Sequence, residues 1–138
     1  MFTIRKLFKF EASHRLKTSY SKCCQLIHGH SYRVEVFLSS KKLNKDGTVI
    51  DFGMIKDIIK KFIEQFDHKL ILCEDDNGFL NYISEENIII IKTNPTAENM
   101  AQFFFRQIKN EFKRKKIKVL VKKIRVWETE TGYAEYEE

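Results

Sequence analysis

Two histidines separated by one residue, His28 and His30, are the first feature of this sequence that suggests chemistry. Side chains two positions apart on an extended strand point to the same side, so the two imidazoles would be presented together. Imidazole nitrogen is a common zinc ligand, and a catalytic zinc ion usually has three protein ligands and one open position. A third ligand is therefore expected, and the chain offers only His14 and His68 as further histidines.

A thiol accompanies this histidine pair. Cys24 stands four residues before His28, and a second cysteine, Cys23, directly precedes it. The reference pKa of a cysteine is about 8.5, and nearby cations lower it, so a thiol close to a metal ion is a plausible base. In the alternative interpretation, Cys24 is the fourth ligand of a closed, structural zinc site.

Hydrophobic periodicity assigns the histidines to the ends of two strands. Residues 2–12 alternate between apolar and polar side chains, and His14 continues the apolar side if the strand extends that far. After a polar connection over residues 15–27, alternation resumes with His28 and His30 on the apolar side of the next strand. If the two strands pair antiparallel, the end of the first lies beside the start of the second. The three histidines are then expected to converge.

The remaining pattern predicts an α+β fold. Two helices could cover one face of a four-stranded antiparallel sheet, in one domain that comprises residues 1–138. Helices are predicted over residues 52–65 and from Asn94-Pro95-Thr96 onward, further strands over residues 117–127 and 133–136, an acidic loop over residues 73–85, and a short extended segment over residues 87–92.

A carboxylate lies on the apolar side of the third predicted strand. Ile124, Val126 and Glu128 share one parity, so Glu128 points the same way as an apolar row. Such a carboxylate is either in water at the end of the sheet or bound to a specific ligand. Its strand is distinct from the strands that carry the histidines, so we expect metal binding to be independent of Glu128.

Composition limits the classes of function. The net charge of +6 suits a nucleic-acid binder or an enzyme with a polyanionic substrate. The basic residues at 113–116 and 122–123 lack interleaved aromatic residues and are typical of a solvated helix end, so no nucleic acid is expected. No apolar run is long enough to span a membrane. Three cysteines, two of them adjacent, do not form a disulfide framework, which favours the cytoplasm.

Six motifs follow one another in order along the chain. They are Phe10-Glu11-Ala12-Ser13-His14-Arg15-Leu16, Cys24 with His28-Gly29-His30-Ser31-Tyr32, Val49-Ile50-Asp51-Phe52-Gly53, Asp67-His68-Lys69, Asn94-Pro95-Thr96-Ala97-Glu98-Asn99 and Glu128-Thr129. Together they resemble the 6-pyruvoyl-tetrahydropterin synthase and 6-carboxytetrahydropterin synthase family.

The resemblance implies a zinc-dependent lyase that acts on 7,8-dihydroneopterin triphosphate. It also implies the tunnelling fold, in which the sheets of several subunits join into a barrel, commonly as a hexamer of two trimers. By position, it implies zinc ligands at His14, His28 and His30, a catalytic thiol at Cys24, proton-relay partners at Asp67 and His68, and a pterin anchor at Glu128 with Thr129.

The spacing between the thiol and the histidines resembles the bacterial branch of the family that serves queuosine biosynthesis. That branch forms 6-carboxy-5,6,7,8-tetrahydropterin and releases acetaldehyde and triphosphate. Two alternatives remain, a 6-pyruvoyl-tetrahydropterin synthase and a basic nucleic-acid-binding domain with a structural zinc ion. Arg15, Lys22 and Lys69 are candidates for contacts with the triphosphate.

Overall fold

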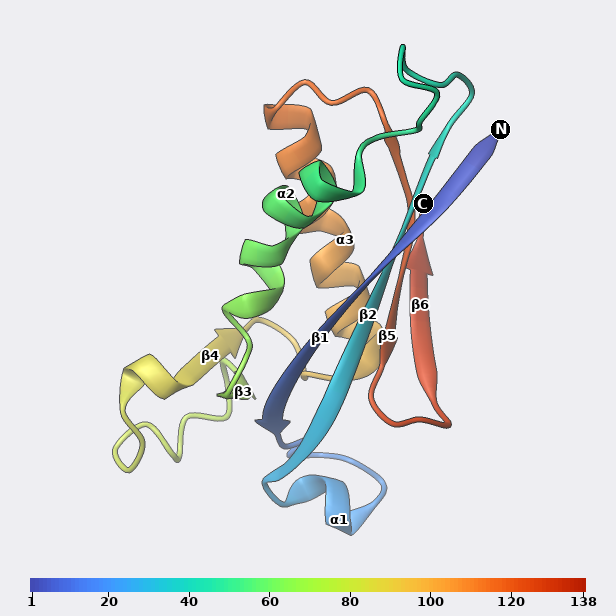
Figure 1. The fold of residues 1–138 in the computed structure, drawn as a ribbon. Coiled ribbons are helices and arrows are strands. Elements are labelled where there is room, and N and C mark those ends of the chain that lie inside the picture. The colour runs from blue at the N-terminus through green and yellow to red at the C-terminus, as the bar shows by residue number, and fades with distance from the viewer.

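A long pair of strands forms the centre of the computed structural model, which describes residues 1–138 (Figure 1). Strand β1 (Phe2–His14) pairs antiparallel with β2 (His28–Ser40) along its whole length, and His14 lies opposite His28. The alternating sequence explains this register, because it buries one side of each strand. The buried side includes Phe8, Phe10, Ala12 and His14 of β1 and Tyr32, Val34, Val36 and Leu38 of β2.

The sheet has six strands, in the order β4-β3-β1-β2-β5-β6. Beyond β2 it continues with the antiparallel strands β5 (Leu120–Trp127) and β6 (Tyr133–Glu137). Beyond β1 it continues with β3 (Lys69–Cys73) and β4 (Ile88–Ile91), each parallel to its neighbour. The four antiparallel strands are therefore those that the sequence predicted, and two parallel strands are added at one edge.

The prediction of a four-stranded sheet was wrong because neither added strand shows alternation. Residues Leu70, Ile71 and Leu72 of β3 are all buried, and strands covered on both faces have continuous apolar runs. Periodicity cannot distinguish such a short run from the tail of the preceding helix. Strand β4 was predicted to be extended, but its pairing with β3 is a contact that the sequence pattern does not specify.

Two long helices cover one face of the sheet (Figure 1). Helix α2 (Phe52–Glu64) begins after Asp51, whose carboxylate accepts hydrogen bonds from two main-chain N–H groups. Helix α3 (Ala97–Arg114) begins after Thr96, whose hydroxyl accepts a hydrogen bond from the N–H of Asn99. These caps agree with the predicted starts. Two short helices, α1 (Lys22–Gln25) and η1 (Glu85–Asn87), lie in the connections.

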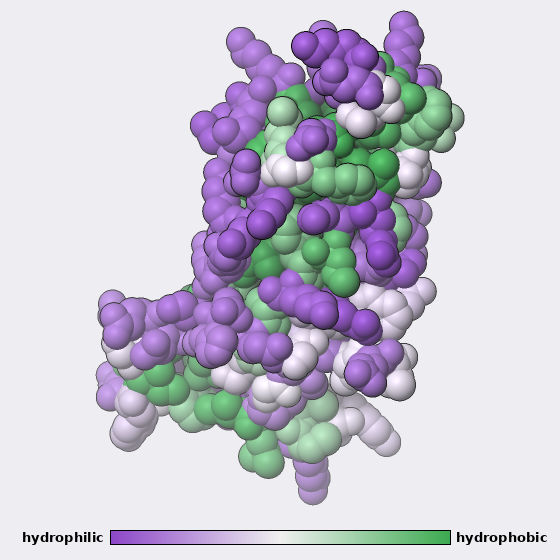
Figure 2. Space-filling view, in the orientation of Figure 1, coloured by the Kyte–Doolittle hydropathy of each residue, from purple (hydrophilic) through white to green (hydrophobic).

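The opposite face of the sheet is mostly polar, with a few large apolar side chains such as Phe37 and Trp127 among the charged ones. Glu35 of β2 is only 4% exposed, and its carboxylate accepts hydrogen bonds from Arg5, Arg125 and the indole N–H of Trp127. Figure 2 shows a surface on which polar side chains dominate and apolar ones gather in smaller areas. No helix is both long and apolar enough to cross a membrane.

A buried carboxylate, Glu111, links the two long helices and should contribute to acid sensitivity. It is 7% exposed and accepts hydrogen bonds from Arg114 and Lys61 at 2.7 to 2.8 Å. The hydrogen bonds from Arg114 and Lys61 lower its pKa to about 2. The pKa is depressed on folding, so the stabilisation is complete above the unfolded value of about 4.3 and is lost as pH falls towards 2.

We therefore expect Glu111→Gln to lower the free energy of unfolding at pH 7, and to lower it progressively less as pH falls from about 4.3 towards 2. Urea denaturation at several pH values measures the difference from the unmodified chain. Glu130→Gln, which removes an exposed carboxylate that makes no ion pair, is the control. A difference for Glu111→Gln that does not change with pH would contradict this explanation.

Candidate active site

Three histidines converge where β1 ends and β2 begins. His14 lies opposite His28, and His30 lies opposite Ala12, on the side of the sheet that the helices cover. One ring nitrogen from each of the three histidines lies within 4.8 Å of the other two. The convergence that strand parity predicted is therefore confirmed, and His68 is not part of this cluster.

Main-chain carbonyl groups determine which ring nitrogens carry hydrogen. His14 Nδ1 is 2.8 Å from the carbonyl oxygen of Pro95, and His28 Nδ1 is 2.7 Å from that of Leu26. A carbonyl oxygen only accepts, so each Nδ1 must donate, which leaves Nε2 of a neutral imidazole as an acceptor. These two Nε2 atoms lie 3.0 Å from each other. Two acceptors at this separation need a cation or a proton between them.

A proton shared between the Nε2 atoms of His14 and His28 is unfavourable at neutral pH. Burial lowers the pKa of His14 to about 4, with the neighbouring histidines acting in the same direction, so its imidazole is neutral. His30 adds a buried Nε2 that has no hydrogen-bond partner. Nitrogen ligands lie about 2.0–2.1 Å from zinc, so two ligands of one ion can lie 3.0 Å apart. The donor set therefore fits a metal ion with nitrogen ligands.

The carboxylate of Glu128 reaches the histidine cluster, contrary to the expectation that it lies apart from it. Glu128 Oε1 is 3.2 Å from His14 Nε2 and 3.6 Å from His30 Nε2. The pairing of β5 with β2 explains this, because the register that sets Val126 opposite Val34 continues to Glu128 beside Tyr32. Burial raises the pKa of Glu128, and the carboxylate of Glu98 raises it further.

A small cavity of about 210 Å³ adjoins Glu128. Its lining includes Thr129, the predicted partner of Glu128, and also Glu98 in the first turn of α3. No site role was predicted for Glu98, although it lies in one of the six motifs. An acidic residue in the first turn of a helix is also expected from the helix dipole alone, so its residue type did not distinguish a site residue from a helix-stabilising one.

Cys24 lies in the short helix α1 and is partly exposed. Burial raises the pKa of its thiol, the Cys23 thiol and the Glu128 carboxylate act in the same direction, and a hydrogen bond with Ser19 lowers it. The direction is opposite to the one expected from nearby cations. The Cys24 sulfur does not belong to the histidine cluster, which gives no support to a closed site with Cys24 as fourth ligand.

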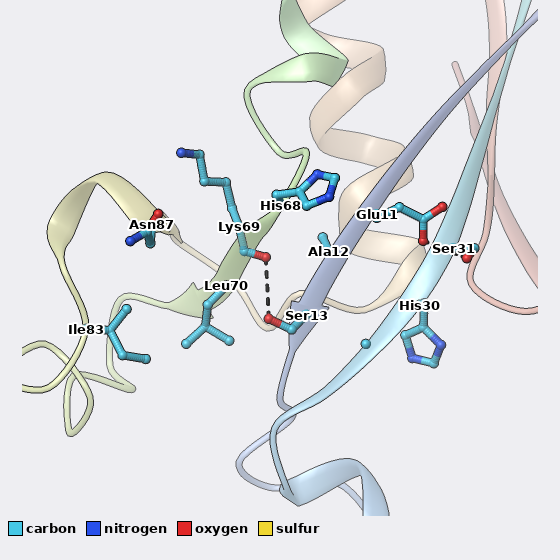
Figure 3. Close-up of a pocket in the computed structure, with 11 residues that line it drawn as sticks. Glu11, Ala12, Ser13, His30, Ser31, His68, Lys69, Leu70, Ile83 and Asn87 are labelled. Carbon is cyan, nitrogen blue, oxygen red and sulfur yellow. Dashed lines mark hydrogen bonds between the residues drawn. The ribbon is translucent and has the colours of Figure 1, made fainter.

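Asp67 and His68 form a second group, beside the edge of β1 that faces away from β2. Asp67 Oδ1 accepts a hydrogen bond of 2.8 Å from the N–H of Glu11, and Asp67 Oδ2 lies 2.9 Å from His68 Nδ1. The His68 side chain is 79% exposed and lines a cavity of about 550 Å³. His30 also lines this cavity, but Figure 3 shows the ends of β1 and β2 between the two imidazoles.

Two of the three candidates for triphosphate contacts already have partners. Arg15 donates two hydrogen bonds, of 2.5 and 2.7 Å, to the buried carboxylate of Asp76. Lys69 Nζ donates to the carbonyl oxygen of Glu86 at 2.5 Å. These contacts hold the segment between β3 and β4 against the rest of the chain.

The fold and the site together define an α+β protein with a histidine cluster that could hold a metal ion. Residues 3–138 match the family model described as 6-pyruvoyl tetrahydropterin synthase, and the chain belongs to this family of enzymes.

Relatives agree with this assignment. A 6-carboxy-5,6,7,8-tetrahydropterin synthase from Rickettsia felis is 42% identical over 115 residues, which cover 80% of each chain. The fold is similar to that of an uncharacterized protein from Wolinella succinogenes, with a TM-score of 0.84 and 21% identity over 99% of this chain and 97% of that one. A 6-pyruvoyl tetrahydropterin synthase from Plasmodium falciparum has a TM-score of 0.74 and 21% identity over 99% and 98%.

Proposed function

We propose that this protein is a zinc-dependent 6-carboxy-5,6,7,8-tetrahydropterin synthase. It converts 7,8-dihydroneopterin triphosphate to the carboxy product, with release of acetaldehyde and triphosphate, in the pathway to queuosine. The observation that carries the proposal is the pair of Nε2 acceptors of His14 and His28, 3.0 Å apart beside the carboxylate of Glu128. Relatives with the carboxy name at up to 42% identity favour this product over the pyruvoyl one. Three unpaired cysteines support a reducing cytoplasm.

His14, His28 and His30 would hold the zinc ion. Main-chain acceptors orient two of the rings, His14 through Pro95 and His28 through Leu26, as partners of the second ring nitrogen commonly do in metal sites. When bound, zinc supplies Lewis-acid chemistry that polarises hydroxyl groups on the substrate side chain and acidifies the adjacent C–H bonds.

Cys24 would remove a proton from carbon next to the polarised hydroxyl groups. The thiolate is the active form of this base. Burial raises the pKa of the Cys24 thiol, so that pKa must be lowered for the thiolate to form. The hydrogen bond with Ser19 already favours the thiolate, whereas Cys23 and Glu128 oppose it. A positive charge close to the histidines would add to the effect of Ser19.

Glu128 would anchor the pterin, with Thr129 beside it. The pyrimidine edge of a pterin presents two parallel N–H groups, and a carboxylate matches them in a bidentate fashion. The cavity of about 210 Å³ beside Glu128 supports this position, and Glu98 offers a second carboxylate at its wall. The raised pKa of Glu128 indicates a carboxylate that lacks strong donors until a ligand supplies them.

Glu128→Gln is expected to weaken binding of an unreactive pterin by about 2–3 kcal/mol, because hydrogen bonds to charged groups contribute about 1.5–3 kcal/mol and an amide offers a donor where an acceptor is needed. Isothermal titration calorimetry of zinc-saturated protein with neopterin measures the change. Glu130→Gln, on the exposed turn that follows, is the matched control. A loss of pterin affinity in Glu130→Gln alone would show that the anchor has been assigned to the wrong residue.

Asp67 and His68 would complete the site of a neighbouring subunit in an oligomeric barrel. Within one chain their contacts are with Glu11 and with each other, while the His68 imidazole faces solvent.

Two observations support an oligomer. Residues 2–10 of β1 and the whole of β6 are open sheet edges, which are templates for pairing with another chain. Exposed Phe2, Leu43 and Phe52 also line a cavity of about 470 Å³. A hexamer of two trimers is the assembly we propose.

A shared site predicts that two inactive variants rescue each other. Cys24→Ala and His68→Ala should each lose most turnover, but oligomers that contain both chains should regain activity. In random mixtures roughly a quarter of the sites would combine an intact Cys24 with an intact His68. Co-expression of differently tagged chains and a turnover assay on the mixed oligomer test this. Isolated mixed oligomers without any regained activity would contradict the shared site.

Turnover by the zinc-loaded protein tests the proposed function as a whole. The protein should consume 7,8-dihydroneopterin triphosphate and release triphosphate, and His14→Ala, with one ligand removed, should not. A folded, zinc-loaded protein that leaves this substrate unchanged would overturn the proposal.

A further inference from the structure

Cys23 is the one reactive side chain beside the proposed site that the proposed mechanism leaves unused. It is exposed, and it lies next to the partly exposed Cys24 in the four-residue helix α1. The two cysteines are adjacent in the chain, and the Cys23 thiol contributes to raising the pKa of Cys24. The third cysteine, Cys73, is buried in β3 and donates to the carbonyl oxygen of Lys92, so it belongs to another part of the fold.

The segment around the two thiols can change shape at low cost. None of the residues of α1 is buried, so no core packing fixes it. Apart from the hydrogen bonds within the helix, its main-chain contacts are the bonds from Cys24 N–H to Ser21 O at 3.0 Å, Leu26 N–H to Cys23 O at 3.3 Å and Leu16 N–H to Cys24 O at 2.8 Å. Elements with few buried contacts open locally with small free energies.

A disulfide between adjacent cysteines is strained and easily reduced. Consecutive Cα atoms are about 3.8 Å apart across a trans peptide, which is below the usual 4.4–6.8 Å of disulfide-bonded residues. Strain raises the reduction potential, and disulfides with high potentials are the labile, regulatory ones. A Cys23–Cys24 bond therefore requires α1 to open, and it would be one that forms under oxidation and that ordinary cellular thiols reverse.

We propose that Cys23 and Cys24 form a reversible disulfide when the protein meets hydrogen peroxide, and that this disulfide switches the enzyme off. The Cys24 sulfur attacks one peroxide oxygen, the O–O bond breaks, and sulfenic acid and water form. The Cys23 sulfur then attacks the sulfenic sulfur, the S–O bond breaks, and a second water leaves. Two thiols lose two electrons and two protons, and one peroxide becomes two waters. The predicted loss of activity rests on the proposed function, because Cys24 is the proposed base. Formation of the disulfide does not depend on the proposed function.

Mass spectrometry can detect the bond without any assay of activity. Trypsin cleaves after Lys22 and Arg33, so one peptide, Cys23–Arg33, contains both thiols and excludes Cys73. After treatment of the zinc-loaded protein with peroxide and then iodoacetamide, this peptide should lack two hydrogens and carry no alkyl group. Dithiothreitol should restore both alkylation sites and at least about 80% of the activity, as expected for disulfide rather than higher oxidation.

Variants separate this switch from simple oxidation of the site thiol. Cys23→Ser should have near-normal activity before peroxide, but the same treatment should inactivate it irreversibly, because Cys24 then proceeds to sulfinic acid. Cys73→Ser should behave like the unmodified chain. The proposal is overturned if the Cys23–Arg33 peptide keeps two alkylatable thiols while activity falls, or if Cys23→Ser recovers with dithiothreitol as the unmodified chain does. If the disulfide forms but Cys24→Ala is fully active, the bond stands and the proposed base is wrong.

Discussion

His28→Ala should lose most of its zinc. The substitution removes one of the three proposed nitrogen ligands and leaves only His14 and His30 to hold the ion. Loss of a group that only orients a ligand costs about 10–100-fold in metal affinity, so loss of the ligand itself should cost at least about 100-fold. Plasma emission spectrometry after dialysis against a weak chelator measures zinc per chain. Activity should fall in parallel, because the proposed Lewis-acid chemistry requires the ion that the three histidines would hold.

His68→Ala is the matched control for metal content. It also removes one imidazole, but His68 lies with Asp67 on the other side of β1. The His68→Ala variant should therefore keep its full zinc content. Circular dichroism and thermal unfolding must show that both variants are folded. Full zinc occupancy in folded His28→Ala would show that the histidine cluster is not the zinc site.

Cys24→Ala should keep zinc and pterin binding while turnover falls by on the order of 10²-fold or more, which is the range for loss of a general base. The side chain is small and partly exposed, so the fold should tolerate the change. Steady-state kinetics with a separate pterin titration distinguish a loss in turnover from a loss in affinity. Cys23→Ala should be mild in the absence of oxidant. The opposite order of effects would show that the other thiol is the base.

Much of this site could be predicted because it depends on strand parity. His14, His28 and His30 all fall on apolar positions of two paired strands, and alternation determines which side they face. The same reasoning located Glu128, directly after β5, on the side of that strand that carries Ile124 and Val126. It did not foresee the contact between Glu128 and His14, because the pairing of β5 with β2 sets that distance.

Features that depend on long-range pairing could not be predicted. Strands β3 and β4 lack alternation, so only their positions in the folded sheet identify them as its edge. The carbonyl groups of Pro95 and Leu26, which set the hydrogen positions on His14 and His28, have no side-chain signal at all. The separation of His68 from the cluster likewise follows from the hydrogen bond of Asp67 to the main chain of Glu11.

Identification of the fragment released from 7,8-dihydroneopterin triphosphate tests the central claim most directly. The zinc-loaded protein is incubated with this substrate under anaerobic conditions, volatile aldehydes are trapped as hydrazones, and the pterin product is identified by mass spectrometry. The account predicts acetaldehyde and 6-carboxy-5,6,7,8-tetrahydropterin in equal amounts, together with triphosphate. Triphosphate with a pyruvoyl pterin and no acetaldehyde would contradict it.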